Sequence, residues 1–468
     1  MDRSELAFLS AAELGGLIER REVSPVEVTE AYLRRIDDLD FKLNAFITVF
    51  RAGAMRKARE AEEAIGRGEY RGPLHGVPVA IKDQFWTKGI RTTGGSRILE
   101  DFVPDEDATV VTRLRETGAV IVGKTNLTEF AITGFSHRYS TPRNPWDLDR
   151  YTGGSSGGSG AATAAFLCAT SLGEDTGGSI RFPASWCGLA GIRPTWGRVS
   201  RYGVMRGLWS MDTVGPLSRS VEDAAITLGA IAGSDPKDGY TSKKPVADYR
   251  AGLSGGVQGM RIGLITDGLG DAGVDAEVRD AVLKAAEVMR ELGAEVDEIS
   301  LPLAKDAAAV SSVLMAVETA ANHSQWIRER AQDYGHDNRI ALQAGSLVPA
   351  HAYYKAQRLR SMVREETLEA LERYSVLLTP TTGTPAQVIK EDQPIGSKEE
   401  AGAQGYLLRR IWNLTSAPAL SVPCGFSAKG LPMGLQIGGR PFDEATVLRV
   451  GHAYEQATRW NQRRPPHA

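Results

Sequence analysis

The sequence predicts an α/β protein in which helices cover both faces of a large, mixed and mostly parallel β-sheet. Short apolar runs of strand length, such as residues 119–122 and 376–378, alternate with longer segments of helical periodicity. Residues 275–292 have helical periodicity and lie between apolar segments near 262–266 and 294–300. This order is that of a βαβ unit, which joins parallel strands.

The N-terminal residues predict three helices in succession. Ser10 is followed three positions later by Glu13, which is the pattern of a capping box. Ser24 precedes Pro25, and proline is favoured at the first position of a helix. A third, charge-rich helix is predicted over residues 51–66.

The pattern then changes to a buried strand over residues 74–83, with Lys82 near its end. Residues 118–125 match the G-x-x-x-x-G-K-[ST] phosphate-loop pattern letter for letter. In a genuine phosphate loop the strand precedes the first glycine and the spacer wraps the phosphate. Here the apolar spacer, residues 119–122, is itself the strand. We therefore predict a strand bounded by glycines and no nucleotide site.

The second half of the chain continues the alternation of helices and strands. Residues 237–259 are rich in glycine, proline, serine and charge, which indicates a surface excursion. Further helices are predicted over residues 307–330 and 350–372 and from residue 443, and further strands over residues 376–378, 420–422 and 433–438.

Composition sets broad limits on location and partners. The chain has 468 residues and a formal net charge of -3, so its overall charge marks no nucleic-acid or membrane-surface binder. No apolar run reaches the ~18 residues of a membrane span, and the N-terminus lacks the apolar core of a signal peptide. The three cysteines are widely spaced, which suits a reducing compartment. We expect a cytoplasmic protein without a metal or cofactor, with no membrane contact and no direct contact with nucleic acid.

Residues 151–181 carry the strongest functional pattern. The segment opens with a run of glycines and serines and closes with Gly177, Gly178 and Ser179. Glycines beside hydroxyl groups let main-chain N–H groups approach a reacting carbonyl closely. A flexible linker has a similar composition, but linkers do not alternate with apolar runs such as residues 161–167. The segment is therefore predicted to form a reactive site.

Three hydrolytic schemes are open to a serine in this segment. Gly153–Gly157 fits the G-x-S-x-G nucleophile elbow of Ser-His-Asp hydrolases, yet the downstream histidines lie in no recognisable motif. Metal-assisted hydrolysis requires clustered ligands such as H-E-x-x-H, and the sequence has no such cluster. In the third scheme Lys82 activates the serine, because burial in an apolar strand lowers the pKa of a lysine and leaves it neutral. The alternative for Lys82 is a strand-end lysine that reaches solvent or pairs with Asp83.

The sequence resembles the amidase signature family over nearly its whole length and in the right order. The matching segments are residues 76–83, 123–126, 153–159 and 175–184, with a weaker C-terminal pattern at residues 379–381 and 420–423. The resemblance implies a single amidase-signature domain over residues 1–468. Its parts would be N-terminal helices in residues 1–66, a signature core in residues 70–225 and a C-terminal part in residues 260–468.

The resemblance implies a Ser-cisSer-Lys triad. Ser179 would be the nucleophile that takes the acyl group, and Ser155, which follows a cis peptide bond in the family, would be the bridging serine. Lys82 would accept a proton from Ser155, which accepts one from Ser179, and the relay would return a proton to the leaving amine. Asp175 and Arg181 are expected to form a buried pair that holds the loop. The oxyanion hole would consist of the backbone N–H groups of Thr176, Gly177, Gly178 and Ser179.

The substrate is predicted from a departure from one branch of the family. The glutaminase subunit of the aminoacyl-tRNA amidotransferase carries an acidic residue before the Asn-Leu of the C-terminal block, where this chain has Tyr406. An aromatic in place of a carboxylate removes the partner of an ammonium group. We therefore expect a stand-alone amidase that cleaves the C–N bond of a small, largely apolar or aryl amide, carbamate or urea, with Gly134, Phe135 and Ser136 binding the substrate and Tyr202, Trp209 and Trp412 lining its pocket.

Two alternatives stand beside this expectation. The first is the glutaminase subunit itself, which supplies ammonia to a partner protein; Arg360 would then match the arginine that binds a carboxylate. The second is an inactive scaffold, which would be expected to lose one of Lys82, Ser155 or Ser179, whereas all three are present. As an amidase the protein would need only a small-molecule amide substrate, and the resemblance favours a homodimer.

Overall fold

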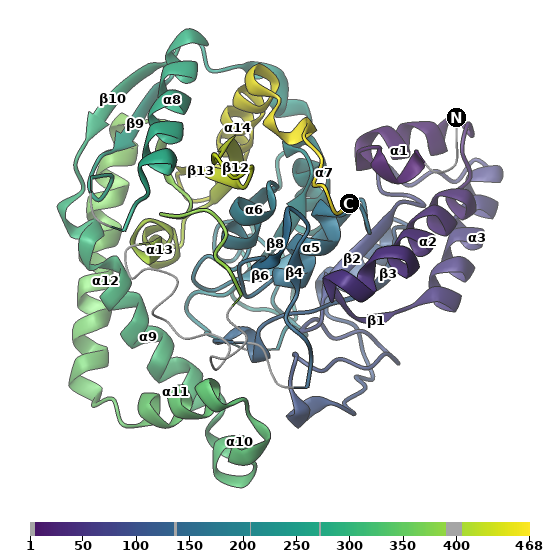
Figure 1. Ribbon diagram of the computed structural model, residues 1–468, viewed down its shortest axis with the longest axis horizontal. Coiled ribbons are helices and arrows are strands. Elements are labelled where there is room, and N and C mark those ends of the chain that lie inside the picture. The colour runs from purple at the N-terminus through teal and green to yellow at the C-terminus, as the bar shows by residue number, and fades with distance from the viewer. Residues whose placement is uncertain (1–4, 135–137, 206, 271–272, 390–404) are drawn as a thin grey trace.

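The computed structural model contains one large sheet surrounded by helices (Figure 1). It describes residues 5–134, 138–205, 207–270, 273–389 and 405–468. The helices of eight residues or more in the first part of the chain are α1 (Ala11–Glu19), α2 (Pro25–Leu43), α3 (Arg51–Gly66), α4 (Thr109–Glu116), α5 (Gly157–Ala164) and α7 (Val221–Ile231). Those of the later part are α8 (Ala276–Glu291), α9 (Ala307–Asn322), α11 (His336–Ser346), α12 (Ala350–Arg373), α13 (Gly405–Thr415) and α14 (Glu444–Thr458), and two shorter helices are α6 (Arg181–Cys187) and α10 (Ser324–Glu329).

The main sheet has 11 strands in the order β1-β3-β2-β6-β8-β7-β12-β13-β11-β9-β10. Its first strands in the chain are β1 (Phe46–Val49), β2 (Pro78–Lys82), β3 (Val120–Thr125), β6 (Thr170–Asp175), β7 (Ala190–Arg193) and β8 (Thr213–Ser218). The later strands are β9 (Arg261–Ile265), β10 (Glu295–Ile299), β11 (Val376–Pro380), β12 (Ala419–Phe426) and β13 (Pro432–Gly439), and β4 (Arg143–Asn144) pairs with β5 (Asp147–Tyr151) outside this sheet.

The sheet is mixed in strand direction. The pairs β2·β3, β2·β6, β9·β11 and β9·β10 are parallel, whereas β8 is antiparallel to both β6 and β7. Helix α8 connects β9 to its parallel neighbour β10, so the predicted βαβ unit is confirmed. The prediction of an α/β fold built on a large mixed sheet is confirmed as well; among the described strands of this sheet, four neighbouring pairs are parallel and six are antiparallel.

Alternate residues of the central strands enter separate hydrophobic clusters, because successive side chains of a strand point to opposite faces. Val79 and Ile81 of β2 belong to the largest cluster of the core. Ala80, between them, belongs to a second cluster with Leu33 of α2 and Ala161 of α5. Both faces of β2 are therefore buried, which explains why a strand carrying Lys82 reads as an apolar run.

The two ends of the sheet carry different groups of helices (Figure 1). Helices α1, α2 and α3 lie beside β1 and β3 at one end, and α9, α11 and α12 lie on the opposite side of the molecule. The capping boxes predicted at Ser10 and Ser24 are present at the starts of α1 and α2. Among the described residues no helix combines the length and the apolar composition that a membrane span requires.

The segment that matches a phosphate loop is a strand, as predicted. Strand β3 includes Lys124, whose side chain is fully buried. Its Nζ donates to the hydroxyl oxygens of Thr87 and Thr92, each at 3.0 Å, and lies 3.6 Å from Oδ1 of Asp83. The Lys124 side chain thus binds buried groups inside the fold and does not face a nucleotide.

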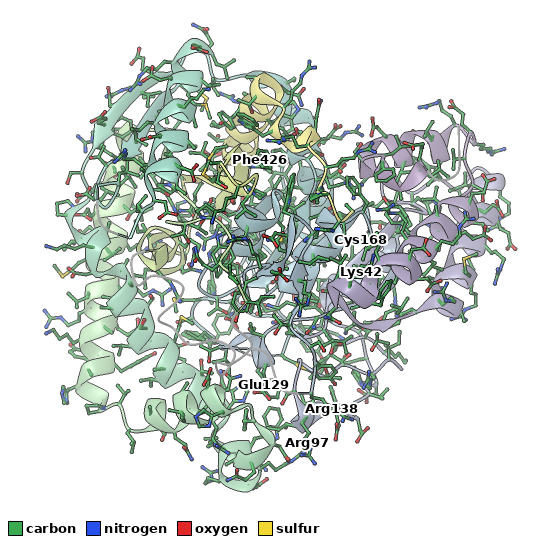
Figure 2. The ribbon with its side chains drawn as sticks, viewed as in Figure 1. Lys42, Arg97, Glu129, Arg138, Cys168 and Phe426 are labelled. Atoms are coloured by element: carbon green, nitrogen blue, oxygen red, sulfur yellow. The ribbon has the colours of Figure 1, made fainter. Side chains whose placement is uncertain are left out.

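The three cysteines are thiols inside the protein. Cys168, Cys187 and Cys424 are all free and buried. Figure 2 shows Cys168 in the interior, beside the central strands. Burial raises the pKa of Cys168 to about 11 and also raises that of Cys187. Because the thiolate is the reactive form of cysteine, these side chains serve packing.

Candidate active site

Strand β2 places Lys82 at the centre of the candidate site. The side chain is fully buried, and its Nζ lies 2.7 Å from Oγ of Ser155. Burial lowers the pKa of the Lys82 ammonium, and the carboxylate of Glu174 opposes that shift. The alternative pairing of Lys82 with Asp83 is not formed, because Asp83 faces Lys124.

Ser155 lies in a turn where the chain passes close to other backbone segments. The peptide bond between Gly154 and Ser155 is cis. Helix α5 begins two residues later, and a Cβ added to its Gly158 would lie 2.4 Å from the carbonyl oxygen of Ala45 and 2.4 Å from the backbone nitrogen of Asn126. Only glycine fits such an approach, which explains the glycine run that surrounds the serine.

Ser179 lies in the loop between β6 and α6, and this loop meets the Ser155 turn through the backbone. The N–H of Ser156 donates to the carbonyl oxygen of Ser179 at 3.2 Å. Ser179 is half-buried, whereas Ser155 is 3% exposed. The structure therefore brings the three residues predicted as a triad to one place, with the accessible serine outermost and the lysine innermost.

Asp175 fixes the loop that carries Ser179. Both its carboxylate oxygens bond to Arg181, from Nε and from Nη2 at 3.0 Å each, and Asn413 donates to Oδ1 at 2.9 Å. The predicted buried pair of Asp175 and Arg181 is confirmed, since both side chains are fully buried. Burial opposes ionisation of Asp175, but Arg181 and Arg193 outweigh it and hold the carboxyl pKa below its usual range.

Asp175 also engages one of the N–H groups predicted for the oxyanion hole. The Gly178 N–H donates to Oδ1 of Asp175 at 2.8 Å. This bond directs the Gly178 N–H toward Asp175. In this structure the N–H group therefore holds the loop that carries Ser179. Gly178 has a φ of 112°, a conformation that side-chain-bearing residues rarely adopt.

A guanidinium group lies directly against the loop. A Cβ added to Gly177 would lie 2.1 Å from Nη1 of Arg410, on α13. The neighbouring Arg409 stacks on the ring of Phe182, with 4.3 Å between the guanidinium carbon and the ring centroid. The glycine at 177 thus makes room for a positive charge beside Ser179, which no motif in the sequence indicates.

Of the residues predicted to bind an apolar substrate, Gly134 alone belongs to the part of the chain that the structure describes. Gly134 accepts a backbone hydrogen bond from Glu129 at 3.0 Å, and Phe135 and Ser136 lie outside the described residues. Figure 2 shows Glu129 in the lower part of the molecule, inward of Arg138. Gly134 has a φ of 58°, which fits a turn.

The three predicted pocket aromatics lie in three different environments. Trp412 is fully buried in the core and packs on Gly438, where an added Cβ would meet its ring at 2.0 Å. Trp209 is 52% exposed and forms a surface cluster with other aromatic rings. The Tyr202 hydroxyl donates to Oε1 of Glu106 at 2.6 Å. A ring in the sequence carries no sign of whether it packs in a core or on a surface, so these three environments could not be predicted.

Arg360 is held by backbone groups of other elements. Its Nε donates to the carbonyl oxygen of Leu414 at 3.0 Å, and its Nη2 donates to that of Ser210 at 3.0 Å. The first bond ties α12 to the end of α13, and the second ties it to the segment before β8. The side chain of Tyr406, on which the choice of substrate depended, lies outside the described residues.

Comparison with known proteins decides the family. Residues 27–448 match the family described as Amidase. The chain belongs to the amidase signature family. This amidase signature protein is 43% identical to a glutamyl-tRNA(Gln) amidotransferase subunit from Geobacter sp. (strain M21), over 99% of this chain and 100% of the relative.

Solved structures of the family share its fold. The crystal structure of a glutamyl-tRNA(Gln) amidotransferase subunit from Thermotoga maritima has a TM-score of 0.82 and 34% identity, covering 96% of this chain and 95% of that one. A bacterial aryl acylamidase has a TM-score of 0.89 and 29% identity, covering 97% of each chain. The relatives with higher identity are thus amidotransferase subunits, although the aryl acylamidase shares the fold as closely.

These relatives overturn two expectations. The expectation of a stand-alone amidase for an apolar or aryl amide is wrong, because curated relatives 40–43% identical over nearly the full chain are named as subunits of glutamyl-tRNA(Gln) amidotransferase. The expectation of a small-molecule substrate as the sole partner, with no nucleic acid, is wrong for the same reason. The difference at Tyr406 from the acidic residue of the glutaminase subunits is weaker evidence about the substrate than the similarity of the whole chain.

Proposed function

We propose that this chain is the glutaminase subunit of a glutamyl-tRNA(Gln) amidotransferase and supplies ammonia to a partner protein that acts on tRNA. The observation that carries the proposal is the similarity to subunits of that enzyme, 43% and 41% identical over 99% and 98% of this chain. The contact between Lys82 and Ser155 supports it, since a glutaminase needs an activated nucleophile.

The reaction would proceed through an acyl-enzyme. Ser179 Oγ attacks the side-chain amide carbon of glutamine and passes its proton to Ser155, which passes its own to Lys82. The proton then returns along the same path to the departing nitrogen, which leaves as ammonia. Water attacks the acyl group by the same route, releases glutamate and restores Ser179.

Backbone N–H groups would stabilise the oxyanion of each tetrahedral intermediate. The Gly178 N–H is engaged by Asp175, so the proposal relies on the N–H groups of Thr176, Gly177 and Ser179. Loss of one such donor typically costs about 3 to 4 kcal/mol of transition-state stabilisation.

Arg410 supports glutamine as the amide. Glutamine carries a carboxylate, and the guanidinium of Arg410 lies against Gly177 beside the nucleophile. A guanidinium binds a carboxylate by charge-assisted hydrogen bonds. Arg360, which the sequence suggested for this role, is held by backbone carbonyl groups.

The experiment is to express the chain with the partner subunits of a related amidotransferase and to measure glutaminase activity and amidation of glutamyl-tRNA. We expect ammonia release that rises in the complex and is lost in Ser179→Ala. Arg410→Gln should raise KM for glutamine more than it lowers kcat. A wild-type complex that hydrolyses an anilide but not glutamine would refute the proposal.

A further inference from the structure

Lys82 also belongs to a second buried polar cluster, which includes Glu174, Thr176 and Asp212. Lys82 Nζ is 3.4 Å from Oε2 of Glu174, whose side chain is 1% exposed. The other carboxylate oxygen of Glu174 lies 2.6 Å from the hydroxyl of Thr176, and that hydroxyl lies 2.7 Å from Oδ1 of Asp212. Lysine, glutamate, threonine and aspartate thus form one chain of contacts.

The sheet creates this cluster. Glu174 is in β6, which is hydrogen-bonded on one side to β2, the strand that carries Lys82. On its other side β6 is antiparallel to β8, and Asp175 pairs with Thr213, the first residue of β8. Asp212 directly precedes Thr213, so the strand pairing brings it to the end of β6. All four side chains of the cluster are buried, with exposures of 4% or less.

The short contacts determine how many protons the two acids hold. The hydroxyl of Thr176 has one proton and can donate it to only one carboxylate oxygen. The second short oxygen–oxygen contact therefore requires a proton on a carboxyl group. Burial, reinforced by the charge of Glu174, raises the pKa of Asp212 to about 8. Glu174 contacts Lys82, so the geometry assigns the shared proton to Asp212.

Other charged groups near the cluster have partners of their own. Asp175, at the end of β6, is bound by Arg181. Arg193, on β7, is 3.4 Å from Asp175. Arg201, which acts on Asp212, lies 3.8 Å from Asp238. Glu174 is therefore the anion that contacts the lysine.

We propose that Glu174 is a positioning residue that sets the basicity of Lys82. The two acids Glu174 and Asp212 share a single proton, which Asp212 holds next to the Thr176 hydroxyl, so one carboxylate acts on the lysine. Burial alone would make the lysine a weak base. One adjacent carboxylate strengthens it, whereas two would keep it permanently protonated. A general base works best when its pKa is near the operating pH. The inference rests on the serine mechanism of the proposed function but not on glutamine as its substrate.

The test follows the nucleophile directly, without any amide substrate. A fluorophosphonate probe bonds its phosphorus to Ser179 Oγ, fluoride leaves with the electron pair of the P–F bond, and the serine proton passes through Ser155 to Lys82. The rate of labelling, measured by intact-protein mass spectrometry on the full chain between pH 5 and 10, reports the protonation of Lys82. Peptide mapping identifies Ser179 as the labelled residue.

We expect Glu174→Gln to move the acid midpoint of the labelling rate down by about 1 to 3 pH units, the usual effect of one charge at this range. Glu174→Gln should also lower the maximal labelling rate reached at high pH, because the lysine becomes a weaker base. Glu174→Asp keeps the charge and should recover most of the midpoint. Asp212→Asn imitates the protonated acid and should keep the wild-type acid midpoint.

The matched control is Glu455→Gln, a second buried glutamate, whose carboxylate accepts from the Val221 N–H on another part of the fold. It should leave the labelling profile unchanged. If Glu174 has only a structural role, Glu174→Gln will lower the labelling rate at high pH but leave the acid midpoint unchanged. That result would overturn the proposal. An equal shift in Asp212→Asn would also overturn it. Wild type that labels as expected but lacks glutaminase activity would refute the proposed function alone.

Discussion

Removal of the charge of Asp175 gives the sharpest test of how the nucleophile loop is held. Asp175→Asn preserves the shape of the side chain but leaves Arg181 and Arg193 buried without their carboxylate. Breaking a buried ion pair by removing one partner costs about 3 to 5 kcal/mol, because the remaining charge is uncompensated. The loop with Ser179 should loosen at the same time, since Asp175 also binds the Gly178 N–H.

The expected change in thermal midpoint follows from the size of the chain. Unfolding entropy is about 2.1 cal/mol/K per residue, which amounts to about 1 kcal/mol/K for 468 residues. The substitution should therefore lower the thermal midpoint by about 3 to 5 °C. Differential scanning fluorimetry at pH 7 would measure it, and the serine-labelling rate would report the loop.

The matched control is Asp297→Asn. Asp297 bonds to Arg261 at 2.9 Å, but both side chains are nearly half exposed, at 46% and 49%. Water screens such a pair, so the control should leave the midpoint within error of wild type. Equal midpoints for Asp175→Asn and Asp297→Asn would refute the reasoning, because burial would then make no difference to the ion pair.

Three further outcomes are expected. Ser155→Ala should lower kcat for amide hydrolysis by about 10²- to 10⁴-fold at an unchanged thermal midpoint, since it removes the proton path to the lysine; unchanged turnover would contradict the relay. Gly158→Ala should destabilise the fold by about 1 to 3 kcal/mol, because its Cβ would meet the backbone of Asn126 at 2.4 Å, and urea unfolding would measure the loss. Glu455 has a pKa raised to about 8 by burial, above the ~4.3 of an unfolded glutamate. The contribution of Glu455 to folding stability is present below pH ~4.3 and is lost as the pH rises toward 8. The thermal midpoint of wild type should therefore fall across this window, and that of Glu455→Gln should fall less. An equal fall in both proteins would contradict the raised pKa of Glu455.

The sequence was sufficient for elements whose signals are local. Ser10 and Ser24 open helices with complete capping boxes, and the helix predicted over residues 51–66 is α3 with the same bounds. The buried strand that carries Lys82 was predictable because residues 78–81 form an apolar run. Strand β8 carried no such signal, since it contains Gly215 and Pro216, and proline in a run argues against a central strand.

The buried cluster around Lys82 and Glu174 lay beyond sequence reasoning for a physical reason. Glu174 lies in β6, a strand that the sequence analysis does not predict, and its partner Thr176 meets Asp212 36 positions along the chain. Only the pairing of β6 with β8 brings them together, and strand pairing depends on the packing of the whole sheet. The expectation of an apolar substrate is wrong for the opposite reason, because it depends on a single residue, Tyr406, and not on the chain around it.

The bonds of Arg181 have a consequence for biosynthesis. Two of its partners, Asn413 and Gln436, follow it by 232 and 255 residues. A ribosome adds about 5 to 20 residues per second, so these partners emerge about 12 to 50 s after the arginine. Throughout that interval Lys82, Ser155 and Ser179 are already synthesised, but Arg181 lacks these two partners. The hydrogen bonds that Arg181 makes in the finished protein are therefore complete only when translation is nearly complete.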